Sequence, residues 1–380
     1  MAGPSTYESW IRNEGIPVVE AFGIEDLLTV PRQSWSRTGG KGALIQLKGM
    51  EGFTGMYLGE IAPGGSLNPE KHFYDELIYI LRGRGATEVW WEKNGKKTSF
   101  EWEEGGMFAL PLNCMHRLLN GSREPVLYLG VTSAPLLMDL IHDPEFIFNC
   151  DHVFHQRFDG ERDYFAPKNH RSQPEGGFWV WESNFIADVR SALVDPAESK
   201  GSGVKITALE MGGSALVGHI AEWPVGRYHK AHHHQGGAIL LILRSKGYTL
   251  MWPQEAGIHP YGAGRGDQVV KVDWKAGSIM SPPTGWFHQH FNTGREPARQ
   301  LAFRYTGNSG KYRLGIAKAL NKAAGAGVRT SVREGGTLIE YEDEDPQIRS
   351  DYNVRIKAHG IEPQMPSVSY RDLAHDRLLQ

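Results

Sequence analysis

The sequence has few cysteines, no long hydrophobic run and no excess of either charge. Only two cysteines, Cys114 and Cys150, occur among 380 residues, too few for a disulfide framework, so a reducing, cytoplasmic location is expected. No stretch approaches the roughly 18 apolar residues of a membrane-spanning helix, and residues 1–10 lack a signal-peptide pattern. Lys and Arg total 41 and Asp and Glu total 44, so we expect neither nucleic acid nor membrane as a partner.

Glycine, proline and aromatic residues are abundant instead. The chain has 46 glycines, 21 prolines, 11 tryptophans and 14 tyrosines, which favours many turns and short strands over long helices. Hydrophobic residues make up 40% and charged residues 22%, as in soluble globular proteins. The sequence contains no dinucleotide fingerprint after a strand, no P-loop and no nucleophile elbow, so these motifs offer no competing function.

The sequence contains an internal repeat. Residues 64–85 and 226–247 both contain a polar, histidine-bearing loop, an apolar strand and a Leu-Arg-x-x-Gly ending. Residues 105–120 and 277–292 share glycine, proline, histidine and asparagine at the same spacing. In both halves a Glu-Pro pair then precedes another apolar strand. Three matches in the same order indicate a duplication.

The short strands, bounded by glycine and proline, predict an all-β protein of two antiparallel barrels or sandwiches in tandem. A few peripheral helices are expected, at residues 135–142 and 310–323 among others. The barrels should bury apolar faces against each other about a pseudo-twofold axis, with Trp and Tyr supplying much of that surface. The expected segments are an N-terminal arm (1–49), barrel 1 (50–150), an inter-domain connection (151–200), barrel 2 (201–310), and a helix with a C-terminal arm (311–380).

Histidines gather at one place in the second copy. His232 and His234 are two residues apart at the start of a strand, so their side chains point to one face. With His288 from a later strand they form a facial set that suits Fe, Zn, Cu, Ni or Mn. A histidine-rich surface loop is the alternative, but a degenerate repetition of the spacing in the first copy favours metal binding. His290 shares the parity of His288, which directs it into the same cavity.

The first copy has a different set of candidate ligands. The corresponding residues are Glu70, His72, Glu76 and His116. Two imidazoles and two carboxylates can also bind a divalent ion, and the harder oxygen ligands favour Mn, Fe or Zn. The alternative is a vestigial site in which glutamate and histidine pair by hydrogen bonds. The residues leave both interpretations open.

These residues resemble the two motifs of the cupin superfamily, specifically of its two-domain members, the bicupins. In the second copy the matching residues are Gly226, His232, His234, Gly277, Pro283, Gly285, His288 and Asn292. In the first copy they are Gly64, His72, Glu76, Gly83, Gly105, Pro111, His116 and Asn120. Glu70, Ala238 and Asn113 depart from the motifs, and the closing glycine of the second copy is displaced to Gly247. The resemblance spans about residues 60–320. It implies two tandem cupin barrels of the double-stranded β-helix, or jelly-roll, type, but no single activity.

Several functions remain open. With Ala238 in place of the glutamate, three neutral imidazoles leave a divalent ion its full charge and up to three open positions. Such a centre resembles three-histidine bicupin dioxygenases of the gentisate type, so the first hypothesis is an Fe(II) dioxygenase that cleaves a small anionic aromatic hydroxy acid or diketone. The candidate catalytic residues are His290, Arg304 and Gln300. The alternatives are a non-redox Zn, Mn or Ni lyase, isomerase, hydrolase or decarboxylase with His290 as base, and a binding protein without turnover.

Other side chains near the barrel are weaker candidates for substrate contacts. Arg227 and Gln289 could anchor or orient a carboxylate. An aromatic pocket could form from Trp252, Trp286, Phe287 and Phe303. A single Arg or Trp near a barrel, however, more often serves the surface or the packing.

The terminal arms suggest an assembly. The C-terminal arm carries Leu338, Ile339, Tyr341, Tyr352, Val354 and Ile356. Because such arms usually dock on a neighbouring subunit, we expect a homodimer or a larger homo-oligomer. The acidic run at residues 340–345 is expected to be solvated.

Overall fold

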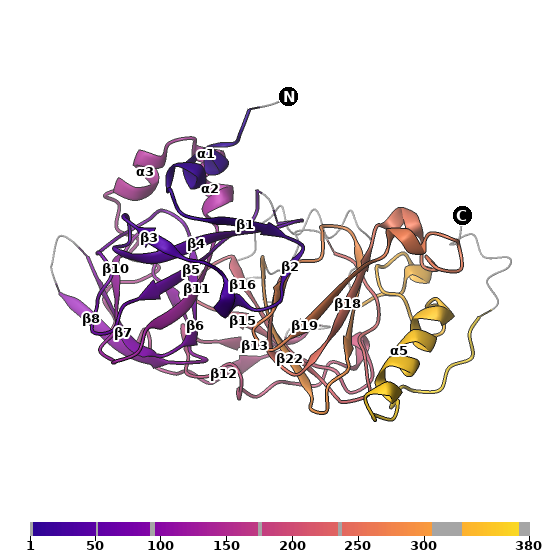
Figure 1. Cartoon of the computed structure of the whole chain (residues 1–380). Coiled ribbons are helices and arrows are strands. Elements are labelled where there is room, and N and C mark those ends of the chain that lie inside the picture. The colour runs from indigo at the N-terminus through magenta and orange to yellow at the C-terminus, as the bar shows by residue number, and fades with distance from the viewer. Residues whose placement is uncertain are drawn as a thin grey trace.

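The computed structural model describes residues 3–50, 52–91, 96–173, 177–234, 238–305 and 329–371. The helix expected at residues 310–323 lies outside them. The described chain forms two β-barrels side by side, with few helices, as the sequence predicts (Figure 1). Within this part of the chain, no helix has the length and apolar character that crossing a bilayer requires.

The first barrel consists of a large sheet and a three-stranded sheet. Its strands are β1 (Val18–Ala21), β3 (Gln33–Trp35), β4 (Gly40–Leu47), β5 (Gly55–Ile61), β6 (Glu76–Arg82), β7 (Arg84–Trp90), β8 (Lys97–Glu103), β9 (Met107–Leu110), β10 (Met115–Leu119), β11 (Val126–Thr132) and β14 (Phe185–Ile186). The large sheet has the order β1-β4-β5-β11-β6-β9-β14, with β3 paired to β4, and the small sheet has the order β10-β7-β8.

The second barrel repeats this plan. Its strands are β2 (Gly23–Ile24), β12 (His170–Ser172), β13 (Trp179–Glu182), β15 (Lys205–Glu210), β16 (Leu216–Trp223), β17 (Ile239–Arg244), β18 (Lys246–Trp252), β19 (Val270–Lys275), β20 (Ile279–Met280), β21 (Phe287–Asn292) and β22 (Ala298–Tyr305). The large sheet has the order β12-β13-β15-β16-β22-β17-β20-β2, and the small sheet has the order β19-β18-β21.

The helices lie at the periphery (Figure 1). The α-helices are α1 (Thr6–Asn13), α2 (Ala134–Ile141), α3 (Pro144–Asn149) and α5 (Pro346–Ala358). Short 3-10 turns are η1 (Leu27–Thr29), η2 (Glu198–Lys200), η3 (Gln254–Ala256), η4 (Gly266–Gln268) and η5 (Val332–Glu334). Helix α1 begins with a reciprocal cap between Ser5 and Glu8, and α2 coincides with the helix expected at residues 135–142.

The barrels exchange short strands. Strand β2 precedes the first barrel in sequence but pairs with β20 of the second, Gly23 opposite Met280. Strand β14 precedes the second barrel but pairs with β9 of the first, Phe185 opposite Phe108. This reciprocity is what a pseudo-twofold relation between the repeats would produce. The segment expected as an N-terminal arm, residues 1–49, also supplies β1, β3 and β4 to the first sheet.

An apolar core joins the two large sheets. It combines Leu58 and Leu129 of the first barrel with Leu301 and Phe303 of the second, and its members are mainly Leu, Ile, Val and Met. The expectation that Trp and Tyr supply much of this surface is therefore wrong, since the cluster holds only two tyrosines among its buried members, Tyr79 and Tyr305. Alternation along the strands explains the difference, because in β11 Leu129 faces the other barrel while its neighbour Tyr128 faces the interior of its own.

The described C-terminal segment packs against its own barrel. Tyr352 and Ile356 of α5, together with Ile339, share a buried cluster with Tyr228 and Phe291 of the second barrel. The apolar residues of the C-terminal arm, from which an oligomer was predicted, therefore pack against the outer face of the small sheet in the same chain. A homo-oligomer stays a prediction, but the C-terminal arm no longer supports it.

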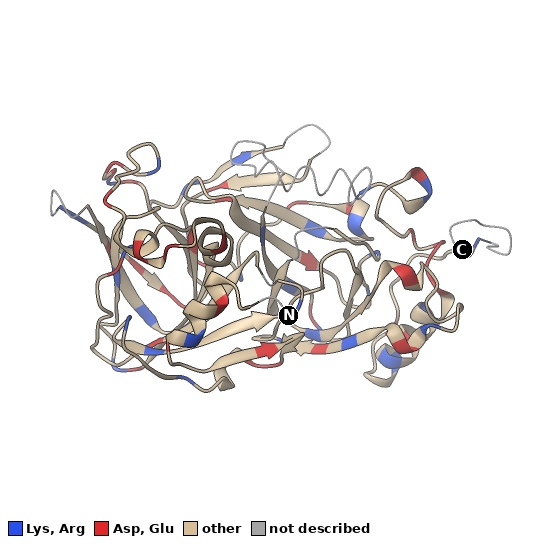
Figure 2. Ribbon diagram, turned by 90° about the horizontal axis from the view of Figure 1, so that it is seen from above, with Lys and Arg blue, Asp and Glu red and all other residues tan. Residues whose placement is uncertain are grey.

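Over the described residues, charged side chains form no separate positive and negative regions: Lys, Arg, Asp and Glu are mixed over both barrels (Figure 2).

The acidic run at residues 340–345 is buried over its last three residues, contrary to expectation. Glu344 is 2% exposed and accepts hydrogen bonds from the Tyr228 hydroxyl and, at 3.1 Å, from the Gln289 amide. Burial raises the pKa of Glu344 above that of a solvated carboxyl. The Asp345 carboxylate accepts hydrogen bonds from the backbone N–H groups of Tyr261 and Gly262, in the insertion after β18, both at 2.8 Å. These carboxylates therefore fasten the C-terminal segment to the barrel.

Docking of α5 within the chain predicts a stability effect. Tyr352 is fully buried and donates its hydroxyl to the Asn292 carbonyl at 2.8 Å, so Tyr352→Ala should lower the free energy of unfolding by about 3–5 kcal/mol. Val354 on the same helix is 70% exposed, so Val354→Ala should change it by less than about 0.5 kcal/mol. Urea unfolding measures both. Equal small effects, or dissociation of an oligomer in place of a stability loss, would contradict docking within the chain.

Candidate functional site

The second-copy histidines come from two segments joined by backbone hydrogen bonds. His232 and His234 lie in the extended segment before β17, and His288 lies in β21. The His232 N–H donates to the His288 carbonyl at 3.1 Å, and the His288 N–H donates back to the His232 carbonyl at 2.9 Å. Alternation then turns His234 to the same face as His232.

An irregularity in this pairing adds another histidine to that face. Between the Tyr228–Phe291 bridge and the His232–His288 bridge, one segment advances four residues (228 to 232) and the other three (291 to 288). Such a bulge interrupts the alternation of side chains. His229 therefore lines the same cavity as His232 although their sequence separation is odd.

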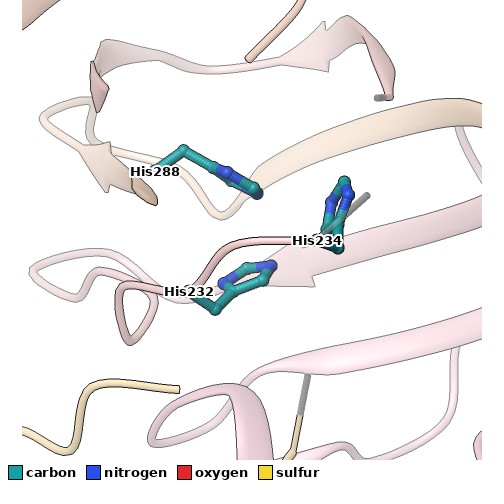
Figure 3. A group of neighbouring side chains, drawn as sticks. All are labelled: His232, His234 and His288. Atoms are coloured by element: carbon teal, nitrogen blue, oxygen red, sulfur yellow. The ribbon is translucent and has the colours of Figure 1, made fainter. Parts of the chain in front are cut away.

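The three predicted ligands face one space (Figure 3). The ring centroid of His288 lies 4.4 Å from that of His232 and 4.9 Å from that of His234. One nitrogen from each ring lies within 4.8 Å of the others. Nitrogens that bind one ion at about 2.0–2.1 Å are roughly 3–3.5 Å apart, so small side-chain rotations would bring this set to ligand geometry.

The surroundings of these imidazoles suit a metal. Nδ1 of His232 lies 3.2 Å from the Lys230 carbonyl, and Nδ1 of His288 lies 3.1 Å from the Trp286 carbonyl. Since a carbonyl only accepts, Nδ1 carries the proton and Nε2 is left as the ligand atom. Burial lowers the pKa of all three histidines well below its usual value, which keeps them in the neutral, metal-binding form. The set fits a divalent transition metal.

The imidazoles open onto a cavity of about 50 Å³ inside the second barrel. Its lining residues are Phe178, Lys200, Ile206, His219, His229, His232, His234, Ala238, Leu240, His288, His290, Gln300 and Arg304. The three residues predicted to be catalytic, His290, Gln300 and Arg304, thus share this cavity with the predicted ligands. Nδ1 of His290 lies 2.9 Å from the Thr249 hydroxyl oxygen, which fixes the orientation of the ring.

The cavity is rich in cations and in uncharged donors. Lys200 and Arg304 line it, and no carboxylate is found among its described lining residues. Burial lowers the pKa of both side chains. Sequence reasoning missed Lys200, His219 and His229. Alternation of side chains along β16 could have predicted that His219 points into the barrel. No pattern in the local sequence indicates that Lys200 reaches the cavity or that a bulge turns His229 inward.

Several weaker candidates do not reach the cavity. Phe287 and Gln289 alternate with His288 along β21 and face outward, where Phe287 and Trp252 join the cluster under α5. Phe303 packs between the barrels, and Trp286 lies beside Phe22. The Arg227 guanidinium donates to the Ser202 hydroxyl at 2.7 Å, outside the cavity. Among the described lining residues Phe178 is the only Phe, Trp or Tyr, so the expected aromatic pocket is absent from the described site.

The first barrel holds a smaller set of candidate ligands. His72 and Glu76 are joined by a hydrogen bond of 2.8 Å, and Nε2 of His116 lies 4.0 Å from the same carboxylate oxygen. Burial would raise the pKa of Glu76, but the bond from His72 and both nearby imidazoles outweigh it and lower the pKa. One atom from each of the three lies within 4.8 Å of the others, so metal binding and hydrogen-bonded pairing both fit.

Glu70, the fourth first-copy candidate, lies apart from this set. Its carboxylate forms an ion pair with the Arg37 guanidinium and is 3.9 Å from Nε2 of His116. Arg37 comes from the N-terminal segment and stacks over Trp35 at 4.5 Å. The Tyr57 hydroxyl, at 2.5 Å, donates to the other oxygen of Glu76. Protein side chains therefore already satisfy much of the first site.

The comparison with protein families agrees with the fold of the first barrel. Residues 47–136 match the family model described as Cupin. No curated protein matches the chain. One similar solved structure concerns proton-coupled electron transfer in oxalate decarboxylase, with 13% identity, a TM-score of 0.49 and coverage of 76% of this chain and 78% of that chain. Another concerns the Mn(II) centres of Bacillus subtilis oxalate decarboxylase, with 14% identity, a TM-score of 0.48 and coverage of 76% and 78%. Both scores are below 0.5, so the fold assignment rests on the strand order and the family match.

The geometry predicts that the second barrel holds one metal ion on its three histidines. His288→Ala removes one of three ligand nitrogens and should remove about one equivalent of Mn²⁺ or Zn²⁺ per chain, measured by elemental analysis at matched folded fraction. His259 lies outside the cavity, where its Nε2 is 2.9 Å from the Asp343 carbonyl, so His259→Ala should leave the metal content unchanged. Unchanged metal content in His288→Ala would contradict the ligand assignment.

Proposed function

We propose that this chain, which consists of two tandem cupin domains, is a metal-dependent enzyme that acts on a small anionic carboxylate in its second barrel. The observation that carries the proposal is one cavity in which three neutral imidazoles face Lys200 and Arg304. Within it we favour a non-redox decarboxylase or lyase with Mn, Zn or Ni over an Fe(II) dioxygenase.

The charge of the cavity supports an anionic substrate. A divalent ion on neutral ligands would add two positive charges to that of Arg304. In the described part of the chain, no carboxylate is paired with Arg304. Burying a guanidinium without a counter-charge is costly, so a bound carboxylate that it grips with two hydrogen bonds would stabilise the site.

The size of the cavity supports a short substrate. A volume of about 50 Å³ is a third of the roughly 150 Å³ that encloses a benzene molecule. An aromatic hydroxy acid has more heavy atoms than benzene and, together with dioxygen, exceeds this space the most, whereas two- and three-carbon carboxylates are closer to benzene or smaller and need the least widening of the cavity. This disfavours the aromatic ring-cleaving reaction considered from the sequence and favours its non-redox alternative.

The chain's own residues support a simple division of roles. When bound, the metal would act as a Lewis acid that attracts electron density from a coordinated carboxylate or carbonyl. Arg304 would hold a carboxylate and Gln300 would orient it, while Phe178 and Leu240 limit the access of water. When a C–C bond breaks and CO₂ leaves, the electron pair stays on the remaining carbon. This carbon would take up a proton from a water molecule, which the neutral His290 ring, oriented by Thr249, would hold by a hydrogen bond.

A panel assay tests the proposal. Protein loaded with Mn²⁺, Zn²⁺, Ni²⁺ or Fe²⁺ is incubated with two- to four-carbon carboxylates, oxalate included, while CO₂ release and oxygen uptake are recorded. We expect release of CO₂ without net oxygen consumption. Substrate-dependent oxygen uptake with iron would instead support the dioxygenase, and no turnover with bound metal would support a binding protein.

Arginine variants test the anchor. Arg304→Gln removes charge-assisted hydrogen bonds in the cavity and should lower kcat/KM by about 30- to 100-fold. Arg227→Gln makes the same change outside the cavity and should leave kcat/KM within about twofold. The reverse ranking of these two variants would contradict the assignment of Arg304.

Histidine variants test which barrel carries the reaction. His288→Ala should abolish turnover, whereas His116→Ala should reduce it far less and act mainly on stability or on metal in the first barrel. Activities are compared at equal folded fraction by circular dichroism. If His116→Ala stops turnover and His288→Ala does not, the set of Glu70, His72, Glu76 and His116 is the reaction centre.

A further inference from the structure

The two barrels share a backbone register, so their interior residues correspond one to one. In the first barrel the Leu67 N–H donates to the Leu118 carbonyl at 2.9 Å. In the second the His229 N–H donates to the His290 carbonyl at 3.1 Å. The flanking bridges have the same one-residue irregularity in both barrels. His229 therefore occupies the position of Leu67, and His290 that of Leu118.

The opposite wall shows the same replacement. His219 of β16 pairs with Ala302 of β22, as Tyr57 of β5 pairs with Gly130 of β11. Two residues before Ala302 and Gly130 in these strands, Gln300 stands in the second barrel where Tyr128 stands in the first. Both tyrosines and both leucines belong to the buried core of the first barrel. The second barrel thus has imidazole or amide groups at four positions where the first has leucine or tyrosine.

These polar groups are expensive to bury. Nε2 of His229 and Oε1 of Gln300 are buried and have no hydrogen-bond partner. A buried polar atom without a partner costs about 1–3 kcal/mol, so such groups rarely serve stability alone. Burial also lowers the pKa of His219 and of His229 to about 3, which leaves both rings neutral with one N–H donor each. Nε2 of His229 is therefore available to donate to a ligand in the cavity, and a flip of the Gln300 amide, which exchanges its oxygen and nitrogen, would add a second donor.

We infer that His219, His229 and Gln300 form a distal binding site for a second carboxylate, so that the substrate is a short dicarboxylate. One carboxylate reaches the metal ligands, and the other is held between His229 on one wall of the cavity and His219 and Gln300 on the opposite wall. The inference rests on the proposed metal-dependent function and adds the substrate class. The match between barrels supports it, because the same backbone in the first barrel closes around leucine and tyrosine side chains that fill the core.

The test compares two probes that differ by one carboxylate. Mn²⁺-loaded protein is titrated with malonate and with acetate, and binding is followed by calorimetry and by the Mn²⁺ electron paramagnetic resonance spectrum. Wild-type protein should bind malonate at least about tenfold more tightly than acetate. His229→Leu should remove most of that difference, a loss of about tenfold for malonate, with Mn²⁺ content and acetate affinity unchanged.

Controls make the result specific. Gln300→Leu, on the opposite wall, should repeat the effect, and His155→Leu, which changes a histidine with 67% side-chain exposure, should have none. In metal-free protein His229→Leu should raise the melting temperature by a few degrees, since it restores the residue of the first barrel. Equal losses for malonate and acetate, or an unchanged malonate preference, would overturn the distal site.

Failure of the distal site can be told apart from failure of the proposed function. Absence of Mn²⁺ uptake overturns the metal-dependent function. In that event malonate is added to metal-free protein, where a rise in melting temperature that His229→Leu abolishes still supports the distal site and no rise overturns it. Mn²⁺ uptake without any malonate preference overturns the distal site alone.

Discussion

Backbone pairing between the segment before β17 and strand β21 is the constraint on which the second site depends. A slip of one residue would turn every imidazole on these segments to the opposite face. The ligand segment is also held on its other side, where the Ile339 N–H donates to the Ala231 carbonyl at 2.8 Å and the His233 N–H donates to the Thr337 carbonyl at 3.2 Å. The C-terminal segment therefore makes this part of the chain an inner strand, although it lies far away in the sequence.

The duplicated backbone supports two different interiors. In the first barrel Tyr57 contributes a ring to the core and a hydroxyl to Glu76, so this interior is filled and largely satisfied by its own side chains. In the second barrel Ala238 takes the place of that glutamate, and the remaining space is bordered by imidazoles and cations. The first copy thus has a stabilising, filled core, whereas the second keeps buried polar groups, which reduce stability, around a cavity. A duplication allows the two copies to differ in this way.

The features that could be predicted from the sequence are those that follow from the two-residue alternation of strands and from the internal repeat. Two barrels, the grouping of His232, His234 and His288, and the entry of His290, Gln300 and Arg304 into one cavity all follow from motif spacing and alternation. The remaining features depend on contacts between distant segments. The bulge that turns His229 inward leaves no mark in one sequence, and Lys200 reaches the cavity from a 3-10 turn. The burial of Glu344 likewise requires a partner surface that only the folded barrel provides.

The reciprocal exchange of β2 and β14 sets an order of events during synthesis. Strand β2 leaves the ribosome early, but its partner β20 begins only at Ile279, so Gly23 and Ile24 must wait unpaired through most of translation. The large sheet of the first barrel likewise lacks an edge strand until Phe185 and Ile186 emerge. Because domains otherwise tend to fold as they appear, this chain delays completion of either barrel until much of the other exists. If translation pauses between the two barrels, the nascent chain exposes an unpaired sheet edge. Other nascent chains, on ribosomes that translate the same messenger RNA, could then pair with this edge.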